Sequence, residues 1–148
     1  MSEPIKFYSV NEMFGEFSNF APYPIVLQKK KWPTSEHYFQ AQKFDDAAYR
    51  EKIRKISSPM VAARMGRSRK VKLRKDWEAR KVNVMHDAVL AKFTQHEELR
   101  VLLLKTADIK IIEHTENDSY WGDGGDGSGK NMLGQILMRV RAVLDEAS

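Results

Sequence analysis

The chain has 148 residues, of which 42% are hydrophobic and 30% charged, a composition typical of one folded domain rather than a disordered chain. It contains no cysteine, which excludes disulfide scaffolds, thiolate metal sites and a cysteine nucleophile. The net charge of +5 favours anionic partners such as phosphates or nucleic acid. No apolar run approaches the roughly 20 residues that span a bilayer, and no apolar signal segment begins the chain. We therefore expect a cytoplasmic protein without a membrane partner.

The first half of the chain predicts a strand, a hairpin and three helices. Residues 5–9 alternate apolar and polar side chains, as in a half-buried strand. The short runs 25–27 and 30–32 can pair as a hairpin. Thr34 or Ser35 can cap the first helix. The three helices are expected over residues 34–44, 47–56 and 58–66.

The second half predicts mainly helices. A long helix capped by Asp76 shows apolar residues at 3- and 4-residue spacing, and another helix follows around residues 99–103. Residues 109–113 predict a strand, and an amphipathic helix ends the chain. Strands, then helices, then one more strand indicate an α+β fold. We expect one mostly helical domain over residues 1–148, with a small antiparallel sheet.

A polar stripe on the helix expected over residues 34–44 is the first candidate site. Glu36, Gln40 and Lys43 stand at positions i, i+4 and i+7, so they share one face. A carboxylate, an amide and an amine on one face can line a polar pocket. The alternative is a solvated face, which is where charged side chains usually lie.

A glycine-rich loop over residues 116–131 is the second candidate site. It holds five glycines and three aspartates and ends where the last helix begins. Glycines let the backbone approach a ligand, and free N–H groups at the helix start, near Asn131, could bind a phosphate. The spacing fits neither a P-loop nor an EF-hand. Trp121 indicates a packed loop, because a large aromatic ring usually finds a partner surface.

The third candidate is the cationic segment 64–75, which holds seven Lys and Arg residues. It is either a solvated face or an edge that contacts phosphates. Arg67 is the first choice for a phosphate, since a guanidinium can bind it through two hydrogen bonds. Trp77 could stack on a base or pack in the core. The four histidines form no metal-binding pattern, so we expect neither a metal nor a cofactor.

Several short motifs follow one another along nearly the whole chain. They are FSNF at 17–20, WPTSEHYFQAQKF at 32–44, SSP at 57–59, AARMGR at 62–67, DW at 76–77, KF at 92–93 and DSYWGDG at 118–124. In this order they resemble the NADAR family, also called YbiA-like, over about residues 7–141.

The resemblance implies an N-glycosidase. In the YbiA-like branch, the implied substrates are phosphoribosylaminopyrimidines, early intermediates of riboflavin biosynthesis, which are cleaved to the pyrimidine and ribose 5-phosphate. Other branches are implied to remove ADP-ribose from guanine in DNA. The expected partner is thus a small phosphoribosyl or ADP-ribosyl molecule, with ADP-ribosylated DNA as the alternative. A module that only binds ADP-ribose or nucleic acid is the third interpretation.

The resemblance also assigns site residues. It implies Glu36, Lys43 and Asp118 as catalytic residues. Together with the residue-level interpretation above, it suggests as substrate-binding residues Asn19, Phe20, Arg67, Trp77, Trp121, Gly122 and Asn131.

Two mechanisms fit the catalytic residues. A carboxylate could stabilise an oxocarbenium-like ribose and activate water. Alternatively, Lys43 could attack C1′ of the opened ribose and form a Schiff base. For the second route burial would have to lower the pKa of Lys43, and Glu36 would oppose that shift.

Overall fold

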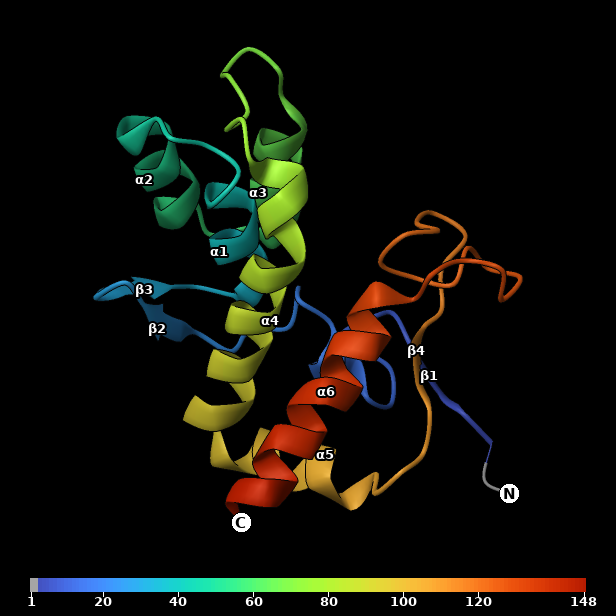
Figure 1. Ribbon diagram of the computed structural model, residues 1–148. Coiled ribbons are helices and arrows are strands. Elements are labelled where there is room, and N and C mark those ends of the chain that lie inside the picture. The colour runs from blue at the N-terminus through green and yellow to red at the C-terminus, as the bar shows by residue number, and fades with distance from the viewer. Residues whose placement is uncertain (1–2) are drawn as a thin grey trace. The chain divides into compact units, whose positions relative to one another are not determined.

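The computed structural model describes residues 3–148 and has an α+β fold (Figure 1). In chain order, the elements are β1 (Ile5–Phe7), η1 (Gly15–Phe17), β2 (Ile25–Leu27), β3 (Lys30–Trp32), α1 (Ser35–Ala41), α2 (Ala47–Lys55), α3 (Pro59–Arg67), α4 (Trp77–Gln95), α5 (Glu97–Lys105), β4 (Ile111–Glu113) and α6 (Met132–Ala147). Two compact units share these elements: Pro22–Lys92 forms one, and the segments before and after it form the other. The single domain over 1–148 stays a prediction.

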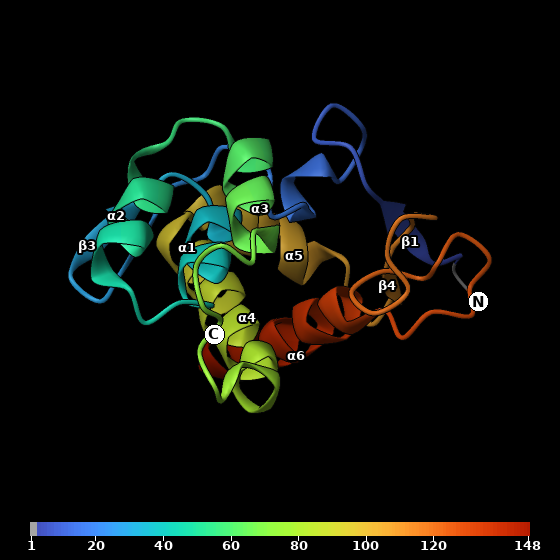
Figure 2. The same ribbon diagram turned by 90° about the horizontal axis from the view of Figure 1, so that it is seen from above.

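In the unit 22–92, the predicted hairpin and three helices are confirmed. β2 and β3 pair antiparallel, with Ile25 opposite Trp32, and both residues are fully buried. α1 contacts both α2 and α3 (Figure 2). Ser58 caps α3 by accepting a hydrogen bond from the backbone N–H of Val61.

The start of α1 is fixed by a buried histidine. His37 is fully buried, with Nε2 2.8 Å from the carbonyl of Ile56 and Nδ1 2.8 Å from Thr34 Oγ1. A carbonyl only accepts hydrogen bonds, so Nε2 carries the proton and Nδ1 accepts from the hydroxyl. Burial lowers the pKa of His37, although the bond to Ile56 opposes this. The neutral ring thus ties α1 to the end of α2.

In the other unit, β1 and β4 pair in parallel, with Ile5 opposite Ile111. The predicted small antiparallel sheet is confirmed by β2 and β3, and this parallel pair is an additional feature that the sequence did not predict. The two strands lie far apart in sequence, and local patterning does not reveal such a pairing. α6 packs on β4 and on α5. The buried Arg141 donates from Nη1 to Thr106 Oγ1 and to the carbonyl of Ile109, which holds α6 to the end of α5.

Within residues 3–148, no helix combines the length and the apolar character needed to cross a membrane.

Candidate active site

The first turns of α1 hold two buried polar side chains against each other. Thr34 caps the helix by accepting a hydrogen bond from the backbone N–H of His37. Glu36 and Gln40 lie one turn apart and are 8% and 7% exposed. The Gln40 amide donates from Nε2 to Glu36 Oε2 over 2.7 Å. Since every residue of α1 is buried, the alternative that Glu36 belongs to a solvated face is wrong.

Lys43 lies just beyond α1, in the turn that follows it. The helix ends at Ala41, so the prediction that Lys43 is part of this helix is wrong. The cause is pairing with the segment after α3. Phe44 forms a β-bridge with Leu73, and the carbonyl of Lys43 accepts a hydrogen bond of 2.8 Å from the backbone N–H of Arg74. These contacts turn the chain out of the helix.

The amine of Lys43 has an unusual environment. Burial lowers the pKa of Lys43 from 10.5 to about 8, while the Glu36 carboxylate acts in the opposite direction. The nearby cations Arg69, Arg67 and Lys81 lower the pKa further. The expected opposition between burial and Glu36 is therefore confirmed. At pH 7, about one molecule in ten carries Lys43 as a neutral amine, the form that can act as a nucleophile.

Trp77 begins α4 and is packed inside the unit. It is 5% exposed, and its ring meets the Phe39 ring edge to face, with the centroids 5.2 Å apart. Lys43 Nζ in turn lies 5.6 Å from the centroid of the Phe39 ring. The geometry supports core packing for Trp77, and stacking on a base stays a prediction.

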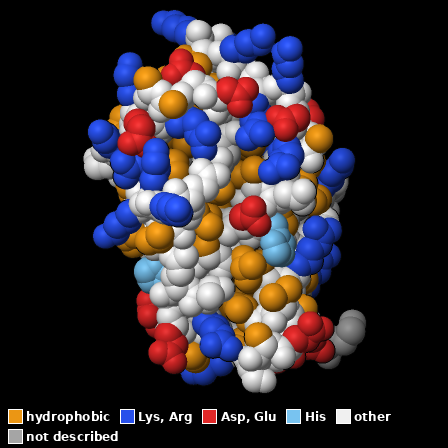
Figure 3. Space-filling model, turned by 60° about the vertical axis from the view of Figure 1, so that its left-hand side comes forward, with side chains coloured by type: hydrophobic (Ala, Val, Ile, Leu, Met, Phe, Trp, Pro, Cys, Tyr) orange, Lys and Arg blue, Asp and Glu red, His pale blue; other side chains and the backbone are white. Residues whose placement is uncertain are grey.

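Two of the cations that lower the pKa of Lys43, Arg67 and Arg69, lie at the end of α3. Arg67 is the exposed last residue of that helix. Arg69 donates from Nη1 to the carbonyls of Gly66 and Ser68, over 3.0 and 3.1 Å. Lys and Arg side chains gather at the end of the unit where α2, α3 and the following segment lie (Figure 3). Such a surface attracts anions, but binding of a phosphate by Arg67 stays a prediction.

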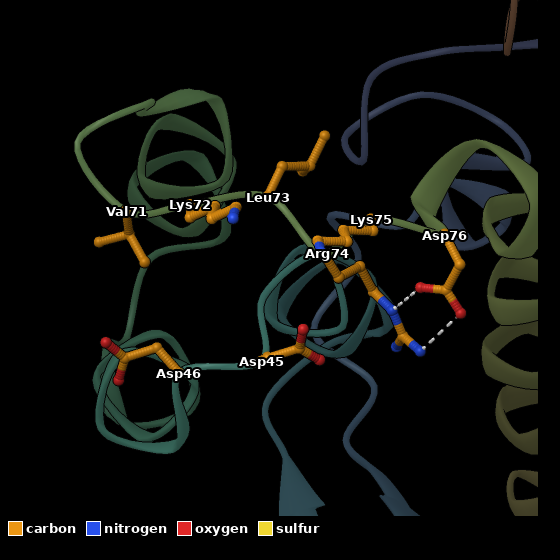
Figure 4. Close-up of a pocket in the computed structure, with 8 residues that line it drawn as sticks. All are labelled: Asp45, Asp46, Val71, Lys72, Leu73, Arg74, Lys75 and Asp76. Carbon is orange, nitrogen blue, oxygen red and sulfur yellow. Dashed lines mark hydrogen bonds and ion pairs between the residues drawn. The ribbon is translucent and has the colours of Figure 1, made fainter.

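A pocket of about 480 Å³ opens where residues 71–76 pass Asp45 and Asp46 (Figure 4). At its edge the Arg74 guanidinium donates to both carboxylate oxygens of Asp76, over 2.6 and 3.2 Å. Its lining contains none of the candidate site residues, so it is a separate feature from the Glu36 site.

In the other unit, Asp118 shapes the glycine-rich loop. Its Oδ1 accepts hydrogen bonds from the backbone N–H groups of Tyr120 and Trp121, over 2.9 and 2.8 Å. A Cβ at Gly122 would lie only 2.9 Å from the carbonyl oxygen of Asp118. Trp121 is half-buried, and its ring meets the Tyr120 ring edge to face. These contacts give Asp118, Trp121 and Gly122 structural roles. Their roles in catalysis and substrate binding stay predictions.

The start of α6 does not offer the free N–H groups that we expected for a phosphate. The first backbone N–H groups donate to carbonyls of the loop: Asn131 to Gly122, Met132 to Tyr120 and Leu133 to Trp121. The Asn131 side chain is also engaged, since Oδ1 accepts from the backbone N–H of Glu113 and Nδ2 donates to the carbonyl of Ile111. These hydrogen bonds anchor the loop to β4 through Asn131, and substrate binding by Asn131 stays a prediction.

Asn19 and Phe20 follow η1 in a tight turn. The backbone N–H of Phe20 donates to Ser18 Oγ over 3.1 Å. Asn19 is buried, while Phe20 is 38% exposed and leaves an aromatic surface open. Their contact with substrate stays a prediction.

The sequence interpretation missed a buried carboxylate in the loop. Asp123 is 4% exposed and accepts hydrogen bonds from His114 Nδ1 over 2.7 Å and from the backbone N–H groups of Thr115 and Gly125. Burial alone would raise the pKa of Asp123, but these hydrogen bonds outweigh it and lower the pKa. Within the described residues, 3–148, no three or more His, Asp or Glu side chains are grouped to hold a metal ion.

The NADAR domain profile matches residues 6–145. The chain belongs to the NADAR family. It is 64% identical over 140 residues to the N-glycosidase YbiA of Shigella sonnei, a match that covers 95% of this chain and 88% of that protein. It is 44% identical over 146 residues to a riboflavin biosynthesis protein of Vibrio vulnificus, covering 99% of this chain and 40% of the relative.

The fold agrees with the family. The NMR structure of the E. coli protein YbiA superposes with a TM-score of 0.91 at 61% identity, covering 98% of this chain and 86% of that one. With such identity over nearly its whole length, this NADAR protein is an enzyme of the N-glycosidase class.

Proposed function

We propose that this NADAR protein hydrolyses the C1′–N bond of phosphorylated ribosylamines, and that phosphoribosylaminopyrimidines of riboflavin biosynthesis are its substrates. The observation that carries the proposal is the half-buried amine of Lys43, whose pKa of about 8 is affected by the charge of the buried Glu36 carboxylate. The name of the Vibrio vulnificus relative supports the choice of substrate.

The amine gives the proposed reaction a covalent route. The ribosylamine opens to an imine at C1′, and neutral Lys43 Nζ attacks that carbon. The C1′–N bond to the pyrimidine then breaks, and the pyrimidine leaves as its amine after it takes up a proton. The Schiff base between C1′ and Nζ adds water and releases ribose 5-phosphate and free Lys43. The net reaction consumes one water.

Glu36 completes this route by moving protons. A carboxylate next to the attacking amine can accept a proton from the adduct and return it to the leaving pyrimidine nitrogen. The proposed phosphate partners are the cations whose charges reach Lys43, namely Arg67, Arg69 and Lys81. A phosphate held among them would place C1′ within reach of the amine, and Arg67 is the exposed member.

Two assays in parallel test the proposal. Purified protein is incubated with the phosphoribosylaminopyrimidine and with ADP-ribosylated DNA, and released ribose 5-phosphate and ADP-ribose are measured. We expect turnover of the pyrimidine substrate, with loss in Glu36→Gln and Lys43→Ala and full activity in the exposed control Met60→Ala. Release of ADP-ribose alone would overturn the proposed substrate, and release of neither product would overturn the proposed function.

A further inference from the structure

The side-chain amide of Gln40 is buried next to Glu36, and the mechanism above assigns it no role. Its Nε2 donates to Glu36 Oε2, while its Oε1 is buried without a hydrogen-bond partner. A carboxylate accepts hydrogen bonds, so the amide has to present its NH₂ group to Glu36. A buried carbonyl without a partner is costly. The Gln40 side chain therefore donates a hydrogen bond to the Glu36 carboxylate, while its own carbonyl oxygen stays without a hydrogen bond.

Room for this amide comes from α3. A Cβ on Gly66 would collide with Gln40 Oε1 and would lie 2.6 Å from Gln40 Cδ. Gly66 lies inside α3, where glycine is less favourable than alanine. Because Gly66 has no side chain, the Gln40 amide fits between Glu36 and the backbone of α3.

We propose that Gln40 is a positioning residue for the Glu36 carboxylate, and that the bare backbone of Gly66 keeps the Gln40 amide in place. With Oε2 bound to the amide, the carboxylate is held in one orientation relative to the turn that carries Lys43. This inference rests on the proposed role of Glu36 in proton transfer.

A double-mutant cycle tests the coupling. Gln40→Met keeps the length of the side chain but removes the donor, and Gly66→Ala displaces the amide without changing Gln40 or Glu36. Both variants are expected to lower kcat about tenfold, the effect of losing a hydrogen bond to a charged group, with KM changed less than about twofold. The cycle is closed with Gln40→Ala alone and Gln40→Ala combined with Gly66→Ala, and these two variants should have nearly the same kcat. Met60→Ala on the same helix is the matched control.

A second readout needs no substrate. The side-chain NH₂ signals of Gln40 in a ¹⁵N NMR spectrum should exchange slowly with water, and Gly66→Ala or Glu36→Gln should remove that protection. Fast exchange in the wild type, or a Gly66→Ala variant with unchanged kcat and unchanged protection, would overturn the inference. A protected amide in a protein that cleaves neither substrate would instead overturn only the proposed function.

Discussion

At the scale of single residues, the candidate site is defined by Lys43 and Glu36, because burial lowers the pKa of Lys43 and the Glu36 carboxylate raises it. Lys43 loses much of its affinity for a proton through burial, and Glu36 restores part of it. The sequence predicts that both residues share a face, and it predicts the direction of both effects. It does not predict that Lys43 lies beyond the end of α1, because that turn depends on pairing with residues 73–74.

The low pKa of Lys43 predicts how activity and stability vary with pH. If the neutral amine attacks, kcat/KM should rise with pH and level off above about 8. The folded pKa lies below the unfolded value, so between about 8 and 10.5 the unfolded chain binds more protons and the contribution of Lys43 to stability increases with pH. Lys43→Met should therefore be more stable than wild type at pH 7, with a smaller advantage near pH 10. Urea unfolding at both pH values measures the stability difference. A pH–rate profile measures the activity, and a kcat/KM that stays constant from pH 7 to 9 would contradict attack by the neutral amine.

Asp118 offers a second test at this scale, because its structural and chemical roles can be separated. Asp118→Asn keeps an Oδ1 that accepts from the N–H groups of Tyr120 and Trp121 but removes the charge. If the Asp118 carboxylate is catalytic, Asp118→Asn should lower kcat by about a hundredfold or more, with little change in melting temperature. Asp118→Ala should lose activity and also about 1 kcal/mol of stability, since the turn loses its acceptor. Near-normal activity in Asp118→Asn would leave Asp118 with a structural role alone.

At the scale of elements, local sequence patterns predict the hairpin and the helix cap, but they do not predict pairing between segments far apart in the chain. The hairpin of β2 and β3 and the cap at Thr34 follow from apolar runs and from a hydroxyl before a helix. The parallel pair of β1 and β4 joins segments about a hundred residues apart, and no local pattern encodes it. The same limit applies to Asn131, whose side chain bonds to the backbone of β4 across the loop. The roles of the candidate site residues in catalysis and binding stay predictions.

The hairpin turn predicts a stabilising substitution. Gln28 and Lys29 have φ angles of 56° and 63°, a left-handed conformation that is costly for residues with a Cβ. Gln28 bonds to Gln42 and Arg50 and should be kept. Lys29→Gly should stabilise the protein by about 0.5–1 kcal/mol, because the strain relieved exceeds the entropy cost of glycine. The control Lys31→Gly, in β3, should destabilise it by a similar amount. Chemical denaturation measures both, and equal effects of the two substitutions would contradict the strain argument.

At the scale of the whole molecule, charge and site residues are unevenly distributed. Residues 64–75 carry seven cations against a net charge of +5 for the chain. Glu36, Lys43, Arg67 and Trp77 belong to the unit 22–92, and the other candidates belong to the second unit. The unit with the amine thus also holds the cations that would attract a phosphorylated substrate.

This charge distribution predicts a dependence on salt. Added salt screens exposed charges, with a Debye length of about 10 Å at 0.1 M. For a phosphorylated substrate, kcat/KM should fall severalfold between about 50 and 200 mM NaCl. Arg67→Ala should raise KM and flatten that dependence, whereas the exposed Lys52→Ala on α2 should do neither. An unchanged KM in Arg67→Ala would remove this residue from the phosphate site.

Borohydride trapping can show whether Lys43 forms a covalent bond to C1′ during turnover, as the proposed Schiff-base route requires. Borohydride is added while the enzyme cleaves the phosphoribosylaminopyrimidine, and peptides are analysed by mass spectrometry. We predict a reduced ribose 5-phosphate adduct on Lys43, with no adduct without substrate and none in Lys43→Ala. A fully active Lys43→Ala enzyme, together with a wild-type enzyme that turns over without any trapped adduct, would contradict the Schiff-base route and leave the chemistry to the carboxylates.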